Sequence, residues 1–223
     1  MPRETSSESV NRYPHVHHDH HAHPHPRQPD LEDQPFRRYQ VMAEAVGELL
    51  IEKGVITAEA LRRTIEDMDA REPAMGARVV ARAWIDPDYR VRLLEDANAA
   101  VAELGIDAGT IPIRAVENTA RVHNVIVCTL CSCYPRMLLG LPPDWYKARA
   151  YRSRMVREPR AVLAEFGTEI PSEVEVRVHD STADLRYLVL PMRPAGTEDL
   201  SEEALAALVT RDCMIGVALP GTR

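Results

Sequence analysis

Three of the four cysteines in this 223-residue chain fall within six residues. The segment that holds them reads Val-Cys-Thr-Leu-Cys-Ser-Cys-Tyr-Pro and spans residues 127–135. Thiolates placed this densely repel one another and oxidise readily unless a metal ion holds them. The segment therefore predicts a metal site, and the rest of the chain is expected to fold around a loop that brings these sulfurs together.

The spacing within the segment suggests a specific set of metal ligands. Cys131, Ser132 and Cys133 are consecutive, so two sulfurs and the backbone nitrogens of the last two residues can lie in one plane. If those amides lose their protons, they close small chelate rings with the sulfurs around a single ion. Cys128 can then bind below the plane, and the position above it stays open for water or substrate, as a catalytic metal requires.

Two other interpretations of the cysteines compete with an open site. The three cysteines with His123 as a fourth ligand would close a tetrahedral zinc site. The chain would then be a zinc-stabilised interaction module, and the spacing alone is compatible with this site as well as with a catalytic one. A disulfide-bonded turn is disfavoured, because the sequence shows neither a secretory signal nor evenly distributed cysteines.

Segment 127–135 resembles the metal-binding signature of the nitrile hydratase α subunit, which the γ subunit of thiocyanate hydrolase shares. The similarity continues through Leu-Gly-Leu-Pro-Pro-Asp-Trp-Tyr-Lys at 139–147 and through 151–160, and it returns at 189–197 and 209–212. It covers about residues 36–220. In this family a threonine between the first two cysteines, here Thr129, accompanies cobalt, whereas a serine accompanies iron.

The resemblance implies a cobalt nitrile hydratase α subunit, which hydrates a nitrile to the amide at a non-corrin Co3+ ion, one per chain. Iron is the less expected metal. The implied ligands are the sulfurs of Cys128, Cys131 and Cys133 with the backbone nitrogens of Ser132 and Cys133. The resemblance also implies that Cys131 becomes a sulfinate and Cys133 a sulfenate, while Cys128 stays a thiolate. The catalytic residues expected from it are Cys131, Ser132 and Cys133, with the Cys133 oxygen as nucleophile or base.

The resemblance further implies partners. Buried oxyanions need cationic hydrogen-bond donors, and family members obtain them from arginines of a β-type subunit. We therefore expect a heterodimer or heterotetramer with an active site at the subunit interface. A metallochaperone or activator is a further candidate partner.

The sequence departs from the nitrile hydratase pattern directly after the signature. Nitrile hydratases usually carry Trp-Pro there, whereas this chain has Arg136-Met137. A guanidinium near the open position favours an anion, and thiocyanate is an anion with a C≡N group. Arg136 is therefore a candidate substrate-pocket residue, and a thiocyanate hydrolase γ-type subunit is the alternative function. A salt bridge across the subunit interface would also explain this arginine.

Composition excludes other classes of function. The net charge is −7 and the basic residues are dispersed, which disfavours nucleic-acid binding. No apolar run approaches the ~20 residues of a membrane-spanning helix. The sequence therefore predicts a cytoplasmic protein that uses no membrane or nucleic-acid partner.

Residues 1–35 are predicted to form a disordered tail, because they are rich in Pro, His and charge and lack an apolar period. The tail is either a solvated arm or tag, or a loose metal-capture segment, since neutral imidazoles bind cobalt well. It contains seven of the nine histidines: His15, His17, His18, His20, His21, His23 and His25.

Residues 36–105 are predicted to be helical. A helix over 36–53 and a second one capped by Thr57 carry apolar stripes, so they form either an arm that docks on a partner or a pair packed on the chain's own core. Two further helices are expected, one from Pro73 to about Trp84 and one over 86–105, where Val91 belongs to the buried face.

Residues 106–223 are predicted to form an α+β catalytic domain, because the apolar period changes from about 3.6 to 2 after Gly105. The family resemblance implies a four-layer α-β-β-α arrangement for this domain. The expected strands span 111–117, 122–127, 174–178, 185–190 and 214–219, and the expected helices span 158–166 and 201–209.

Overall fold

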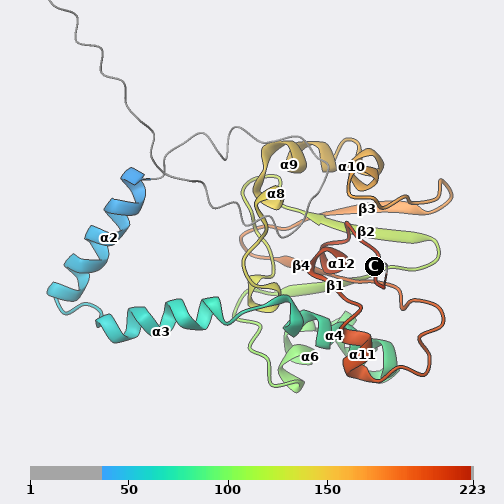
Figure 1. Ribbon diagram of the computed structural model, residues 1–223, viewed down its shortest axis with the longest axis horizontal. Coiled ribbons are helices and arrows are strands. Elements are labelled where there is room, and N and C mark those ends of the chain that lie inside the picture. Colours follow the sequence, from blue (N-terminus) through green and yellow to red (C-terminus); the bar gives the residue numbers. More distant parts are fainter. Residues whose placement is uncertain (1–36, 222–223) are drawn as a thin grey trace, which may run out of the picture.

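The computed structural model of the protein describes residues 37–221 (Figure 1). The predicted tail over 1–35 and its seven histidines lie outside the described residues. The strands are β1 (Ile113–Glu117), β2 (Val122–Val127), β3 (Glu175–Asp180) and β4 (Arg186–Leu190). The helices are α2 (Arg37–Glu52), α3 (Ala58–Asp69), α4 (Pro73–Ile85), α5 (Pro87–Glu95), α6 (Ala97–Glu103), α7 (Arg136–Leu139), α8 (Asp144–Lys147), α9 (Arg149–Met155), α10 (Pro159–Glu165), α11 (Glu202–Ala206) and α12 (Arg211–Ile215).

The body of the molecule has four layers. Strands β1 and β4 form one parallel pair, and β2 and β3 form another. Helices α9 and α10 lie outside the β2–β3 pair, and α4, α6 and α11 lie outside the β1–β4 pair (Figure 1). The predicted α+β class and the α-β-β-α order are confirmed.

The chain reverses direction between β1 and β2. An antiparallel bridge between Thr119 and Val122 closes the turn, so β2 runs back across the β1–β4 pair. The carboxyl end of β2 therefore lies at the amino ends of β1 and β4. This end carries the cysteine loop, which begins at Cys128 directly after the last residue of β2.

The core lies between the layers and is mostly aliphatic. Residues 125–127 of β2 and residues 188–190 of β4 are all buried. Trp145 contacts Tyr151 and Phe166 edge to face, with ring centroids 4.9 and 4.7 Å apart. Burial of this apolar surface holds the two sheets against their helices, and it gives β2 a rigid end from which the loop departs.

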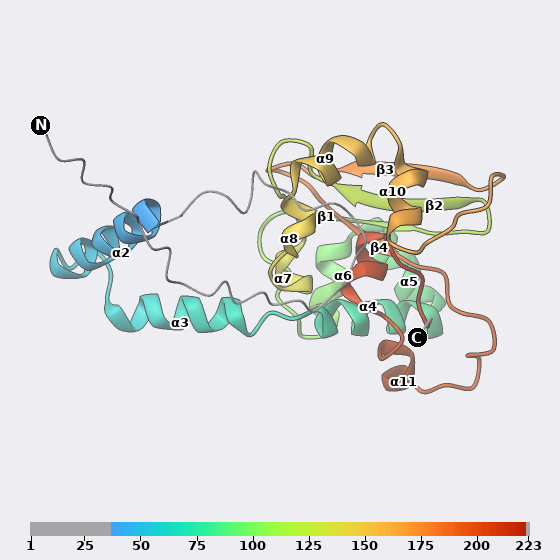
Figure 2. The ribbon, with the colours of Figure 1, turned by 45° about the horizontal axis from the view of Figure 1, so that its top comes forward.

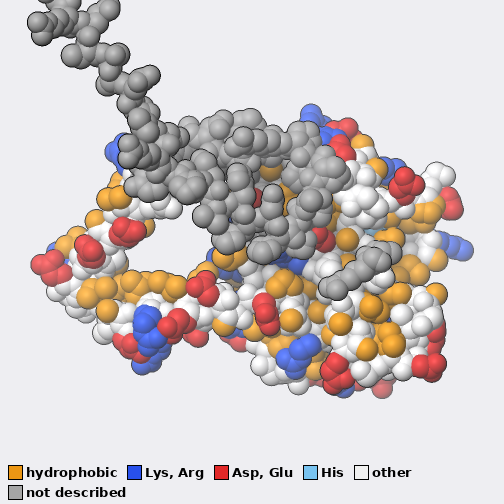
Figure 3. Space-filling view, in the orientation of Figure 1, with side chains coloured by type: hydrophobic (Ala, Val, Ile, Leu, Met, Phe, Trp, Pro, Cys, Tyr) orange, Lys and Arg blue, Asp and Glu red, His pale blue; other side chains and the backbone are white. Residues whose placement is uncertain are grey.

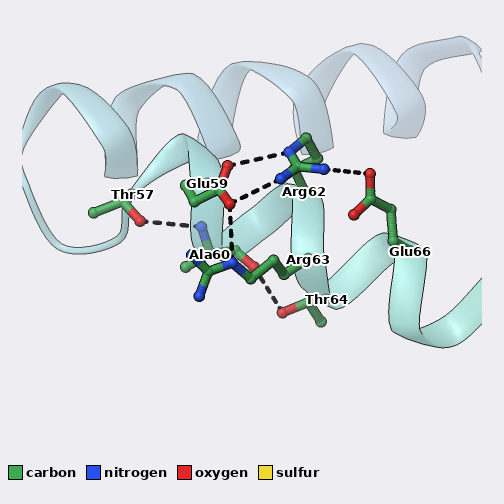
Figure 4. Close-up of polar contacts among 7 residues, drawn as sticks. All are labelled: Thr57, Glu59, Ala60, Arg62, Arg63, Thr64 and Glu66. Carbon is green, nitrogen blue, oxygen red and sulfur yellow. Dashed lines mark hydrogen bonds and ion pairs between the residues drawn. The ribbon is translucent and has the colours of Figure 1, made fainter.

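Helices α2 and α3 stand apart from the body in both ribbon views (Figures 1 and 2). No residue from 38 to 69 is buried. The Oγ1 of Thr57 accepts a hydrogen bond from the backbone of Ala60, and ion pairs of Arg62 with Glu59 and Glu66 stabilise the exposed face (Figure 4). A row of hydrophobic side chains follows α3 (Figure 3). The structure therefore has an arm, and its exposed apolar residues include Met42, Val46, Leu49, Leu61 and Ile65.

The prediction of a single helix over 86–105 is wrong. The chain forms α5 and α6, and Asp96 separates them by accepting a hydrogen bond from the backbone of Ala99 at 3.0 Å. Asp96 is thus the N-cap of a new helix. The break changes which residues face the core, and Val91 is 53% exposed although the pattern placed it on the buried face.

The prediction of a strand over 214–219 is also wrong. Thr210 caps the short helix α12 by accepting a hydrogen bond from the backbone of Cys213. The helix ends at Gly216, whose φ of 94° and close approach to the Asn124 carbonyl leave no room for a side chain. A short segment whose side chains are all buried shows no alternation of apolar and polar residues. Its hydrophobic pattern therefore cannot distinguish a helix from a strand. The helix predicted over 201–209 begins at its Ser201 cap but ends at Ala206.

Candidate metal centre

The fold brings the three sulfurs of the cysteine loop together. The Sγ atoms of Cys128 and Cys131 are 3.5 Å apart, and those of Cys131 and Cys133 are 3.2 Å apart. All three lie within 4.8 Å of one another, and no disulfide joins them. Within the part of the chain that the structure describes, no further histidine, cysteine or carboxylate joins this group. The arrangement matches the predicted sulfur ligands of a single ion.

The three cysteines differ in their access to solvent. Cys128 is fully buried, Cys133 is partly buried and Cys131 is exposed. Leu130, between the first two cysteines, is 89% exposed. The loop therefore presents a buried sulfur at its base and an accessible face above it, as an open site needs.

The zinc tetrahedron with His123 does not form. The Nε2 of His123 donates to the Gly216 carbonyl at 2.7 Å, and its Nδ1 accepts from the Asn118 side-chain amide at 3.3 Å. Both ring nitrogens are thus used in buried contacts, Nε2 with the end of α12 and Nδ1 with the turn between β1 and β2. Burial also lowers the pKa of His123, which keeps the imidazole neutral.

The electrostatics of the loop act in opposite directions on Cys131 and Cys133. Burial raises the pKa of Cys133 to about 12, and the neighbouring Cys131 sulfur adds to this rise. The hydrogen bond from Cys133 lowers the pKa of Cys131, and the backbone N–H groups of Ser132 and Cys133 lower it further. The same two amides are the predicted nitrogen ligands. A trivalent cation would stabilise all three thiolates and reverse the unfavourable shift, so the ligand set fits such an ion.

Asp180 holds the first turn of the loop, and the sequence analysis did not identify it. Its Oδ1 accepts a hydrogen bond from the Thr129 backbone at 2.9 Å, and its Oδ2 accepts from the Thr129 hydroxyl at 2.6 Å. Asp180 is the last residue of β3 and pairs in register with Val127, the last residue of β2. The available signal was a carboxylate two residues beyond the strand predicted over 174–178, but the sequence did not reveal that β2 pairs with β3.

Tyr146 supports the other end of the loop and was also not identified. Its hydroxyl donates to the Cys133 carbonyl at 2.9 Å. Its ring packs against Tyr134, with centroids 5.3 Å apart. Burial of the phenol raises its pKa well above the ordinary value, so that it stays a hydrogen-bond donor. Tyr146 lies within the matched segment 139–147, which was the only sequence signal for it.

Arg136 begins α7 and is exposed. Its Nη2 donates to the Met68 sulfur at 2.9 Å, at the end of the arm helix α3. Its side chain has no carboxylate partner among residues 37–221. The structure therefore leaves this guanidinium available next to the loop, and its predicted role toward substrate stays a prediction.

Between residues 37 and 221, the helices are too short or too polar to cross a bilayer.

The comparisons with known proteins agree on one family. The family model described as nitrile hydratase, alpha chain, matches residues 37–218. The chain is 52% identical over 181 residues to the alpha subunit of the low-molecular weight cobalt-containing nitrile hydratase of Rhodococcus rhodochrous. This alignment covers 80% of this chain and 87% of the relative. The chain is 44% identical over 194 residues to the gamma subunit of Thiobacillus thioparus thiocyanate hydrolase, and this alignment covers 82% of this chain and 80% of the relative.

Solved structures give the same result. A recombinant thiocyanate hydrolase with partially modified cobalt centres superposes with a TM-score of 0.78 at 44% identity, over 82% of this chain and 89% of that one. A double mutant of the Fe-type nitrile hydratase from Comamonas testosteroni Ni1 superposes with a TM-score of 0.76 at 40% identity, over 85% of this chain and 98% of that one. With the family model matching most of the sequence and the three cysteines gathered in one loop, the chain belongs to the nitrile hydratase α-chain family.

Proposed function

We propose that this chain is the α subunit of a cobalt nitrile hydratase, which hydrates nitriles to the corresponding amides. The observation that carries the proposal is the convergence of three sulfurs on a loop with one accessible face. Relatives about half identical to this chain are named cobalt-containing nitrile hydratase alpha subunits. Thr129 between the first two cysteines is the family's cobalt-type residue.

The residues that would hold the ion are Cys128, Cys131 and Cys133 through sulfur, with Ser132 and Cys133 through backbone nitrogen. When bound, a Co3+ ion supplies Lewis-acid polarisation of the nitrile. Soft thiolates suit a transition metal better than magnesium or calcium. Asp180 and Tyr146 hold both ends of the loop, so that the ligands keep a fixed arrangement.

We further propose that dioxygen oxidises Cys131 to a sulfinate and Cys133 to a sulfenate once the metal is in place. The order of exposure supports this assignment, because Cys131 and Cys133 are accessible while Cys128 is fully buried. Susceptibility of cysteine to oxidation follows thiolate character and exposure. Cys128 would remain a thiolate.

The Cys133 oxygen would then perform the proton and bond chemistry at the accessible face. It would accept a proton from the water that attacks the nitrile carbon. If it attacked the carbon itself, a water would then add to that carbon and the bond between the carbon and the Cys133 oxygen would break, which regenerates the sulfenate. The nitrile nitrogen gains a proton, and tautomerisation of the resulting imidic acid gives the amide, so that one water is added overall. The hydrogen bond from Tyr146 to the Cys133 carbonyl fixes the backbone that carries this oxygen.

A partner subunit would complete the site. Leu130 is almost fully exposed next to the exposed Cys131, and the arm carries an exposed apolar row. Such surfaces are typical of protein–protein contacts. We therefore propose a β-type partner in a heterodimer or heterotetramer, with a metallochaperone or activator as a further partner. We also propose domain limits near residues 35 and 105, a cytoplasmic location, and capture of metal by the histidines of the tail.

The second candidate is a thiocyanate hydrolase γ-type subunit. Arg136 favours it, because its exposed guanidinium has no carboxylate partner among the described residues and thiocyanate is an anion. A purified complex with the partner would be assayed with an uncharged nitrile and with thiocyanate. Preference for the nitrile supports the first function. Preference for thiocyanate that is lost in Arg136→Trp supports the second, and a zinc-loaded chain without either activity contradicts both.

A further inference from the structure

The short helix α7 follows the cysteine loop and is tied to it. Cys133 lies three positions before the first residue of α7. The Tyr134 hydroxyl donates to the Leu139 carbonyl at 3.2 Å, and the Arg136 N–H donates to the Tyr134 carbonyl at 2.7 Å. Tyr134 is buried, and Leu139 is fully buried. The position of α7 therefore sets the position of the Cys133 end of the loop.

Gly140 ends α7 in close contact with the arm root, which is the segment 70–72 between α3 and α4. Its φ of 71° and ψ of −155° form a backbone conformation that is essentially restricted to glycine. A Cβ atom on this residue would lie 2.5 Å from the Arg71 carbonyl oxygen and 3.4 Å from the Glu72 Cα atom. Both are backbone atoms, so neither could give way without displacing the arm root. The two backbones therefore pack in direct contact.

A second set of contacts completes the support of α7. Arg71 donates from Nη1 to the Asp107 carbonyl at 3.0 Å and from Nη2 to the Asp107 carboxylate at 3.4 Å. The other carboxylate oxygen of Asp107 accepts from the Gly109 N–H at 2.8 Å. Gly109 in turn faces α7, because a Cβ atom on it would lie 3.1 Å from the Met137 Cγ atom. The arm root and this turn thus enclose α7 from two directions.

We propose that the arm root is a seat for α7 that positions the Cys133 end of the cysteine loop, with Gly140 and Arg71 as its positioning residues. The inference rests on the proposed function, which supplies the metal ion that the loop holds. The last turn of α3 reaches α7 as well, since the Met68 sulfur accepts a hydrogen bond from Arg136. The arm thus has a role in its own chain besides the docking on a partner that is proposed above.

The seat has a consequence for how long the site keeps its metal ion. Asp180 fixes the first turn of the loop through Thr129, and Tyr146 binds the Cys133 carbonyl. The seat fixes the chain that continues beyond Cys133. Metal ligands hold an ion firmly only while the residues that support them keep all donors in place. A displaced α7 would move the Cys133 sulfur and nitrogen away from the other ligands, so that the ion is released faster.

The test compares two glycines that both have a positive φ. The complex with its partner subunit would be purified from cobalt medium as wild type, Gly140→Ala and Gly167→Ala. Gly167 is the matched control, because its φ is 79° and an added Cβ atom would meet no atom of the described residues within 4 Å. One readout is the rate of cobalt loss to a chelator. The other is hydrogen exchange of the backbone amides of 128–135 in the same complexes expressed without cobalt.

Gly140→Ala is expected to lose cobalt roughly tenfold faster than wild type, the lower end of the effect of residues that orient metal ligands. Its loop amides should also exchange faster, because the added methyl group displaces α7 or the arm root. Gly167→Ala should match wild type in both readouts. Cobalt loss from Gly140→Ala at the wild-type rate overturns the inference, and so does equally fast loss from Gly167→Ala.

A second pair of variants decides if Gly140→Ala yields no folded complex. Arg71→Gln removes the bonds to Asp107 without adding volume, and it should lose cobalt severalfold faster. Its control is Arg92→Gln, which removes an exposed ion pair with Glu103 and should match wild type. Equal rates in these two variants overturn the inference. A wild-type complex that contains no cobalt overturns the proposed function instead, and hydrogen exchange then decides on the seat alone.

Discussion

Asp180 binds Thr129 twice, through the backbone N–H at 2.9 Å and through the hydroxyl at 2.6 Å. The contact joins the end of β3 to the first turn of the cysteine loop. By the resemblance described in the sequence analysis, Thr129 is also the residue expected of a cobalt-type signature. The carboxylate therefore fixes the segment between the buried Cys128 and the exposed Cys131.

Asp180→Asn is expected to weaken metal retention. An asparagine side chain has only one acceptor oxygen, and its NH2 group would face a donor of Thr129. Because the pair is exposed, we expect a small loss of global stability, about 1 kcal/mol or less, but a severalfold faster loss of cobalt to a chelator. Asp184→Asn, an exposed change in the following loop, is the control and should release cobalt at the wild-type rate.

A double-mutant cycle separates the two bonds. Thr129→Val removes the hydroxyl and keeps the backbone donor. If both bonds act on one loop conformation, the effects of Thr129→Val and Asp180→Asn on cobalt release will be less than additive. Fully additive effects would show that the hydroxyl contact does not act through Asp180.

Tyr146→Phe removes the hydroxyl that binds the Cys133 carbonyl and leaves the ring contact with Tyr134 in place. We expect a loss of about 1 kcal/mol in urea unfolding together with a lower turnover of nitrile. Tyr151→Phe is a matched control, because its hydroxyl binds the Ile126 carbonyl in β2. It should destabilise the fold with a smaller effect on turnover per folded molecule. Equal effects on turnover would contradict the role given to Tyr146.

Stability should fall on acidification because of one buried and one partly buried histidine. Burial lowers the pKa of His123 and of His179 in the folded state. The unfolded chain, with a histidine pKa of about 6.5, therefore binds more protons than the folded chain. The stabilisation is complete above that value and is lost as the pH falls from it toward the lower folded-state pKa.

This dependence can be measured as the urea midpoint between pH 7.5 and pH 5. His123→Gln can donate to the Gly216 carbonyl and accept from Asn118, as the imidazole does, but it cannot take up a proton. The variant should show a shallower fall of the midpoint. A midpoint that rises on acidification, or an unchanged slope in His123→Gln, would contradict the assignment.

The sequence predicted the cysteine group because its members are adjacent in the chain. Cys128, Cys131 and Cys133 need only a turn to converge, so their spacing was informative without any tertiary knowledge. The cap at Thr57 and the strand over 122–127 are local in the same sense, and both are confirmed.

The supporting residues could not be predicted in this way. Asp180 lies 51 residues from Thr129, and its role depends on the parallel pairing of β2 with β3. The structural role of His123 likewise depends on its contact with the Gly216 carbonyl, 93 residues away. These are non-local contacts that hydrophobic periodicity does not encode. The helix α12 was missed for a different reason, since Cys213, Met214 and Ile215 are all buried and show no period.

The central claim is that one loop binds a single cobalt ion through sulfur and backbone nitrogen and that two of its cysteines are then oxidised. The most direct measurement combines metal analysis with the intact mass of this chain from the purified complex. The account predicts about one cobalt per chain and a mass increase of about three oxygen atoms, two on Cys131 and one on Cys133. Zinc in place of cobalt, with the mass of the unmodified chain, would contradict it.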